Sequence, residues 1–82
     1  MSTFRDLTLW QKAMELAEAV YALCKQLPDV ERFGLISQMQ RAAVSIPSNI
    51  AEGHGRYSDN DFIRFLQIAN GSKCELQTQI LL

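Results

Sequence analysis

Few side chains in this sequence have the types and spacing that catalysis requires. His54 is the only histidine, and it stands between Gly53 and Gly55 in a segment typical of a turn. Nucleophilic hydrolysis needs a base held beside an activated serine or cysteine, and a di-metal helical site needs repeated Glu-x-x-His pairs. Glu52, His54 and Glu75 provide neither pattern and form only a weak alternative hydrolase or metal site. The sequence therefore predicts a non-enzymatic protein with no catalytic, metal or cofactor-binding residues and no small-molecule substrate.

The two cysteines, Cys24 and Cys74, lie fifty positions apart. Neither has a cysteine or histidine at the spacing of a metal site. Both fall within stretches of helical periodicity. We expect both to be buried free thiols.

A stripe of polar side chains recurs at steps of three and four residues in the middle of the chain. Small hydroxyl and amide groups prevail where solvent-facing helices usually carry lysine and glutamate. Three interpretations are open: a solvated face, a contact with another subunit, or a ligand or nucleic-acid site in which guanidinium groups contact phosphate. The candidate interface or nucleic-acid-binding residues are Gln38, Arg41, Ser45, Ser48, Asn49, Glu52, Arg56 and Arg64.

Length and composition limit the class of protein. The 82 residues, 48% apolar and 21% charged, predict one globular domain over residues 1–82 and exclude a disordered tail. A net charge of -1 argues against nucleic-acid binding through bulk charge. The sequence has neither a secretory signal pattern nor an apolar run long enough to span a membrane. We expect a cytoplasmic protein without a membrane partner.

Apolar periodicity predicts three long helices and no strand. The first covers about residues 8–27, with apolar residues at alternating steps of four and three, and stops before Pro28. The second covers about residues 30–53 and opens with acidic residues, which suit the positive end of a helix dipole. The third covers about residues 59–82 and follows Ser58, a favourable N-cap.

Short-range signals refine the helix ends. Thr8 and Gln11 have the spacing of a capping box, and Asp6 is an alternative cap. Gly53 and Gly55 are expected to end the second helix by adopting positive backbone dihedrals.

Two residues inside the predicted helices are unusual there. Pro47 removes one backbone hydrogen bond, so we expect a bend near residues 43–47 rather than a helix end. Gly71 and Ser72, close to Ala69, would let another helix approach closely.

Three helices of similar length with short connections imply antiparallel neighbours, hence an all-α up-down bundle. The sequence stops within the third apolar pattern at Ile80, Leu81 and Leu82. Leaving such residues uncovered is costly for a small domain. We therefore expect either a fourth helix after the chain end or a neighbouring subunit over this surface.

The run from Gln38 to Gly53, Gln-Met-Gln-Arg-Ala-Ala-Val-Ser-Ile-Pro-Ser-Asn-Ile-Ala-Glu-Gly, followed by Arg56, resembles the signature of a known family. The family comprises small four-helix-bundle proteins encoded in intervening sequences of bacterial 23S rRNA genes. The resemblance covers nearly the whole chain. Its further positions are Leu7, Trp10, Ala13, Pro28, Glu31, Gly34, Leu35, Phe62, Phe65, Leu66, Ala69, Gly71, Ser72, Glu75 and Leu76.

The resemblance implies an up-down four-helix bundle that assembles into ring-shaped homopentamers. Related accessory variability proteins of diversity-generating retroelements bind nucleic acid and a reverse transcriptase, so RNA or a protein partner is implied as well. Gln40 stands where many relatives carry a second arginine beside Arg41. We therefore expect a non-enzymatic, homo-oligomeric helical module. The alternative is an RNA-binding accessory protein whose arginines are gathered by the ring.

Overall fold

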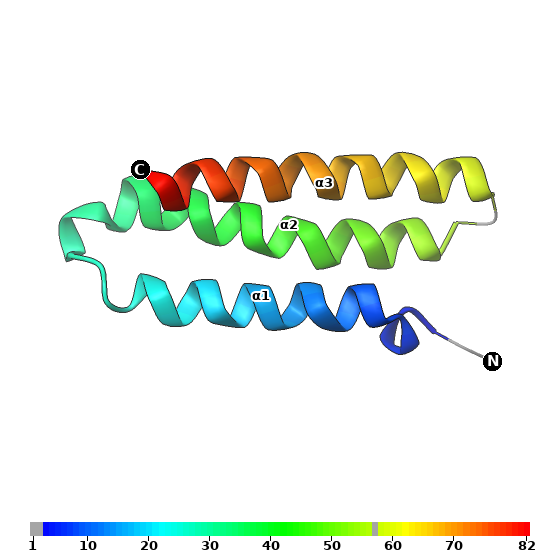
Figure 1. Ribbon diagram of the computed structural model, residues 1–82, viewed down its shortest axis with the longest axis horizontal. Helices are drawn as coiled ribbons and strands as arrows, with labels where there is room; N and C mark the ends of the chain where they lie inside the picture. Colours follow the sequence, from blue (N-terminus) through cyan, green and yellow to red (C-terminus); the bar gives the residue numbers. More distant parts are fainter. Residues whose placement is uncertain (1–2, 57) are drawn as a thin grey trace.

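The computed structural model describes residues 3–56 and 58–82, and helices account for its architecture (Figure 1). Three long helices run up, down and up: α1 Thr8–Cys24, α2 Ser37–His54 and α3 Asp59–Leu81. A short 3-10 helix, η1 Phe4–Asp6, precedes α1. Within the described ranges there is no strand. The predicted all-α up-down arrangement is confirmed for these three helices.

The connection between α1 and α2 is longer than predicted. α1 ends at Cys24 rather than near residue 27, because the amides of Gln26 and Leu27 bond to carbonyls three residues back and tighten the last turn. A 3-10 turn, η2 Asp29–Glu31, and a π-helical turn, η3 Arg32–Ile36, then lead into α2. α2 therefore begins at Ser37 and not at residue 30.

The start of α1 differs from the predicted capping box. Leu7 is the N-cap and supplies no side-chain hydrogen bond. The capping box forms one turn earlier, where Thr3 and Asp6 bond to each other's backbone around η1. Gln11 Nε2 donates to the carbonyl of Arg5 at 2.8 Å, which ties η1 to α1 instead of completing a box with Thr8.

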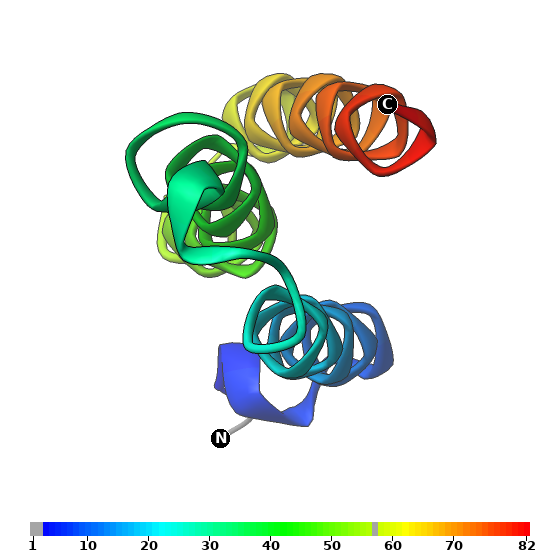
Figure 2. The same ribbon diagram turned by 90° about the vertical axis from the view of Figure 1, so that its left-hand side faces the viewer.

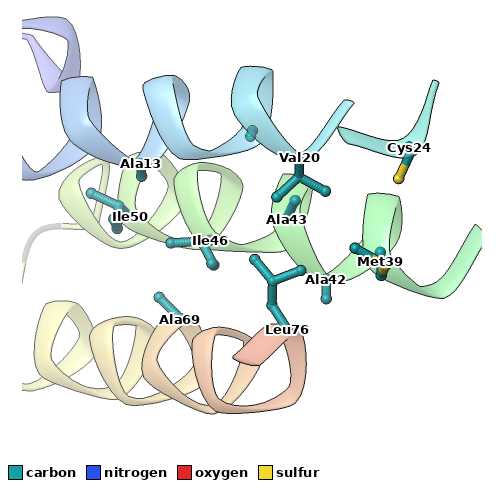
Figure 3. Packing of buried hydrophobic residues seen from close by; sticks show 11 residues of the cluster. Ala13, Val20, Cys24, Met39, Ala42, Ala43, Ile46, Ile50, Ala69 and Leu76 are labelled. Carbon is teal, nitrogen blue, oxygen red and sulfur yellow. The ribbon is translucent and has the colours of Figure 1, made fainter. Parts of the chain in front are cut away.

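α2 is the central helix, because both α1 and α3 pack against it. The buried contacts combine alanines with larger residues, so the helices approach closely. Figure 3 shows Val20 of α1 and Leu76 of α3 directed toward the part of α2 that contains Ala43. Pro47 is buried, and α2 continues through it as one helix. The buried cluster comprises Ala13, Ala17, Val20, Cys24, Met39, Ala42, Ala43, Ile46, Ile50, Ala69 and Leu76.

At the α2–α3 corner, glycine is needed because it has no side chain, and not because its backbone adopts a positive φ. No glycine in the described ranges has a positive φ, and Gly55 sits at φ -76°. The predicted left-handed helix end is therefore wrong. A Cβ on Gly53 would lie 2.6 Å from Cβ of Phe65, so the missing side chain permits α3 to approach. The Ser58 hydroxyl accepts a hydrogen bond from the Asp61 amide, which confirms the predicted cap.

The predicted close approach at Gly71 does not occur among the described residues. A Cβ at Gly71 would meet nothing within 4 Å. Its neighbour Ser72 does reach α2, where the Ser72 hydroxyl donates to Ser45 Oγ at 2.9 Å. Close packing at Gly53 and this hydrogen bond together set the register of α3 on α2.

Seen along the helices, α1 and α3 diverge from α2 on the same side of the molecule (Figure 2). The molecule is elongated, with extents of 44 × 21 × 17 Å. None of the helices in the described part of the chain combines the length and the apolar character that crossing a bilayer would take.

Candidate functional site

The residues of the predicted polar stripe lie in different environments. Ser45 and Asn49 are half-buried at the α2–α3 contact, where Asn49 Nδ2 donates to Ser45 O at 2.7 Å and to Ser45 Oγ at 2.9 Å. Gln38 and Arg41 are exposed, and Arg41 Nη2 donates to Ser37 Oγ at 3.2 Å. The stripe is therefore not one continuous surface. Of its two most central members, Ser45 also bonds to Ser72 of α3 and so links the two helices.

Two arginines do come together at the α2–α3 corner. Cζ of Arg56 lies 5.0 Å from the centroid of the Phe65 ring, and Cζ of Arg64 lies 5.4 Å from it. Each also contacts an acid: Arg56 pairs with Glu52 at 3.0 Å, and Arg64 with Asp61 at 3.5 Å. These pairs are half-exposed, and surface pairs of this kind are weak. The guanidinium groups therefore stay available to other anions.

Arg41 does not join this pair. It lies near the start of α2, whereas Arg56 follows the C-terminal end of this helix, and the thirteen positions from Arg41 to His54 alone correspond to roughly 20 Å at 1.5 Å per residue. A single chain therefore concentrates two of the three arginines of the predicted nucleic-acid site.

The residues of the alternative hydrolase or metal site are spread out. Glu52 pairs with Arg56, and the His54 ring contacts Phe62 edge-to-face with centroids 6.0 Å apart. Glu75 lies past Ser72, and the Ser45–Ser72 register places it about ten positions from Glu52 along α2, or roughly 15 Å. Within residues 3–56 and 58–82, no group of three or more histidine, cysteine or acidic side chains could hold a metal ion.

A hollow lies between α1 and α2, on the side away from α3, and we call it the outer groove. It measures about 580 Å³, and aromatic and aliphatic groups dominate its walls. Tyr21 is 42% exposed and Val44 43% exposed, which is high for side chains of this type. Its lining residues are Trp10, Met14, Ala17, Glu18, Tyr21, Ala22, Lys25, Val44, Pro47, Ser48 and Ala51.

A second apolar surface, which we call the inner groove, lies between α1 and α3 on the side visible as the open angle in Figure 2. It contains two hollows of about 230 and 390 Å³. The first is lined by Leu9, Ile46, Ile50, Leu66, Ala69, Asn70 and Lys73. The second, next to the α1–α2 connection, is lined by Leu23, Leu27, Pro28, Glu31, Leu35, Met39, Gln79, Ile80 and Leu82.

The two grooves use different sides of α1. Leu9 and Leu23 line the inner groove, whereas Trp10 and Tyr21 line the outer groove, and no residue lines both. α1 therefore presents apolar side chains in three directions: toward α2, toward the inner groove and toward the outer groove. One neighbouring helix can cover only the first of these.

The cysteines also differ from the prediction. Cys24 is buried between the helices as expected, and burial raises the pKa of its thiol. Cys74 is exposed on α3, so the prediction that it is buried is wrong.

Sequence reasoning placed the functional surface on the polar stripe and missed the outer groove. The available signal was the width of the apolar arc on the first helix, where Trp10, Ala17 and Tyr21 extend the main stripe. Helical periodicity alone cannot tell whether such an arc is covered by the same chain or by another.

Comparison with known proteins adds one match. No curated protein matches this chain. A family model described as "23S rRNA-intervening sequence protein" matches residues 5–82. That range contains all three long helices and both grooves. On this evidence, the chain belongs to the 23S rRNA-intervening sequence protein family.

Proposed function

We propose that this protein is a non-enzymatic, cytoplasmic assembly module that associates with further copies of itself. The outer groove is the observation that supports this proposal. It exposes Trp10, Met14 and Tyr21 of α1 beside Val44 and Pro47 of α2, and contiguous apolar surface of this kind marks protein contacts. Aromatic side chains are also the groups that most often dominate the binding energy of such contacts.

The rim of the outer groove is suited to a protein contact. Glu18 and Lys25 stand there two helical turns apart, and neither forms an ion pair with another described residue. Charges at the edge of an apolar patch mainly set orientation and partner choice. We propose a further helix over the inner groove, which completes a four-helix bundle, and a ring of five copies, the number that the family resemblance implies.

Size-exclusion chromatography with light scattering on the chain tests the proposed self-association. The expected result is an oligomer at micromolar concentration, with a mass close to five chains. A stable monomer under these conditions would contradict the proposal.

A second candidate function is RNA binding, and the placement of Arg56 and Arg64 over Phe65 favours it. Each chain is nearly neutral, so one copy offers little charge to RNA. Symmetric assembly would repeat the two arginines around a ring, and repeated guanidinium groups bind phosphates through bidentate contacts.

Transcribed fragments of 23S rRNA are the probe for this second function. Binding should weaken steeply as salt rises, and Arg56→Ala or Arg41→Ala should reduce it. Lys12→Ala is the control, because it removes one exposed positive charge from α1, on neither groove. Absent binding, or binding that salt does not change, would exclude RNA as the partner.

A further inference from the structure

Two apolar side chains stand almost fully in solvent at the bend between α1 and α2. Phe33 is 90% exposed and Val30 85% exposed, on the turns η2 and η3 at one end of the elongated molecule (Figure 1). A Cβ added at Gly34 would meet nothing within 4 Å, so the space beside Phe33 is open. We call the exposed residues Asp29, Val30, Arg32 and Phe33 the bend tip. Its two apolar groups protrude from the molecule and lose their contact with water only in an assembly.

The outer groove has the opposite shape. It is a hollow of about 580 Å³ whose walls include Trp10, Tyr21 and Pro47. Two such hollows that face each other leave empty space, whereas the cores of stable interfaces are packed as densely as protein interiors. A second copy that presented its own outer groove would therefore fill this one poorly. A protruding side chain fills it better, and a phenylalanine ring also packs favourably against other aromatic rings.

The charges of the bend tip and of the groove rim are complementary. Arg32 adjoins Phe33, with its Cζ 5.9 Å from the ring centroid, and Asp29 stands at the start of η2. Neither charge forms an ion pair with another described residue. The rim of the outer groove likewise holds one acid and one base, Glu18 and Lys25. The acid of each surface can therefore meet the base of the other, and such pairs orient two partners at the edge of an apolar contact.

We propose that the bend tip of one copy inserts into the outer groove of the next copy, with the Phe33 ring against Trp10 and Tyr21. This inference rests on the proposed self-association and specifies the surface that fills the outer groove. The contact joins two different surfaces, so each copy in a chain of contacts still offers a tip or a groove to a further copy. Contacts of this kind produce a ring when the rotation between neighbours closes, whereas two identical grooves in contact would stop at a dimer.

Three single substitutions to aspartate test the contact. Phe33→Asp alters the bend tip, and Val44→Asp alters the outer groove. Ile63→Asp is the matched control, because Ile63 is 53% exposed on α3 and lines neither groove. In sedimentation velocity over a concentration series, Phe33→Asp should weaken association about tenfold or more, and Ile63→Asp should leave it unchanged. Circular dichroism should show the same helix content in all three variants.

A mixture of Phe33→Asp and Val44→Asp distinguishes a tip-to-groove contact from a contact between identical surfaces. The first variant keeps an intact groove, and the second keeps an intact tip. One contact can therefore form between the two chains, and no surface is left for another. The mixture should contain a complex of two chains at concentrations where each variant alone is a monomer, and nothing larger.

Two results would overturn the inference while the unmodified chain still associates: Phe33→Asp that associates as strongly as Ile63→Asp, or a mixture with no more two-chain complex than either variant alone. The proposed self-association would then stand, with another surface in the groove. A monomeric unmodified chain would contradict the self-association and this inference together, so the two failures are distinguishable.

Discussion

Gly53 of α2 and Phe65 of α3 are in such close contact that a methyl group on the glycine would lie 2.6 Å from Cβ of the phenylalanine. The same methyl would lie 3.1 Å from Cδ1 of Phe62. Both neighbours belong to the first turns of α3, and Cβ of Phe65 cannot move without the backbone. This glycine therefore sets how closely the two helices meet at their corner, which also holds Arg56 over the Phe65 ring.

Gly53→Ala and Gly71→Ala should change stability in opposite directions. At Gly53 the added methyl forces α3 away, and overpacking of this kind costs about 1–3 kcal/mol. At Gly71 the methyl meets nothing within 4 Å, so replacing glycine inside a helix should stabilise by up to about 1 kcal/mol. Urea unfolding followed by circular dichroism measures both. Equal effects of the two substitutions would contradict the packing role of Gly53.

Ser45→Ala and Ser72→Ala should be strongly non-additive. Ser72 donates to Ser45 Oγ, and Asn49 donates to the same oxygen. Either single substitution should destabilise by about 1 kcal/mol, because it removes a partly buried hydrogen bond. The double variant should cost little more than either single one. Strict additivity in a double-mutant cycle would show that the hydroxyls do not interact.

The two cysteines should react with thiol reagents at very different rates. Cys74 is exposed, whereas burial protects Cys24 and raises the pKa of its thiol, which lowers the fraction of reactive thiolate at neutral pH. Ellman's reagent should therefore label Cys74 rapidly and Cys24 only after denaturant is added. The Cys74→Ser variant is the control and should show no rapid phase. Fast labelling of both thiols in the folded protein would contradict the burial of Cys24.

Val44→Asp should weaken self-association by about tenfold or more, because a carboxylate in the outer groove would lose its hydration at an apolar contact. Ala19→Asp is the matched control: it adds one carboxylate to an exposed position of α1 that lines neither groove. Sedimentation velocity over a concentration series compares the two. Equal dissociation of both variants would exclude the outer groove as the contact between copies.

Much of this fold is predictable from the sequence, because helix formation depends on local periodicity. The three long helices, their order and the Ser58 cap follow from apolar spacing and capping chemistry. The second helix was predicted seven residues too early, because the acidic residues after Pro28 also suit the turn that η2 and η3 form. Short-range signals do not distinguish a first α-helical turn from a 3-10 turn.

The candidate site was less predictable, since it depends on which side chains meet across helices. The spacing of Ser45 and Asn49 is that of an exposed stripe, yet both are half-buried and Ser72 of another helix bonds to Ser45. Gly53 has the sequence context of a helix end, and only the position of Phe65 shows its packing role. Neither groove can be predicted from one segment of the sequence, because each is lined by residues from more than one helix.

The π-helical turn η3 should allow the connection between α1 and α2 to lose one residue without changing how the helices pack. The hydrogen bond of a π turn spans one residue more than that of an α turn. Arg32–Ile36 therefore contains one residue more than an α-helical turn leading into α2 would contain. Phe33, 90% exposed, and Gly34 lie on its outer side. We expect a one-residue deletion there to convert the turn to ordinary α-helix without rotating Met39 out of the core, and insertions and deletions during evolution should concentrate at this bend.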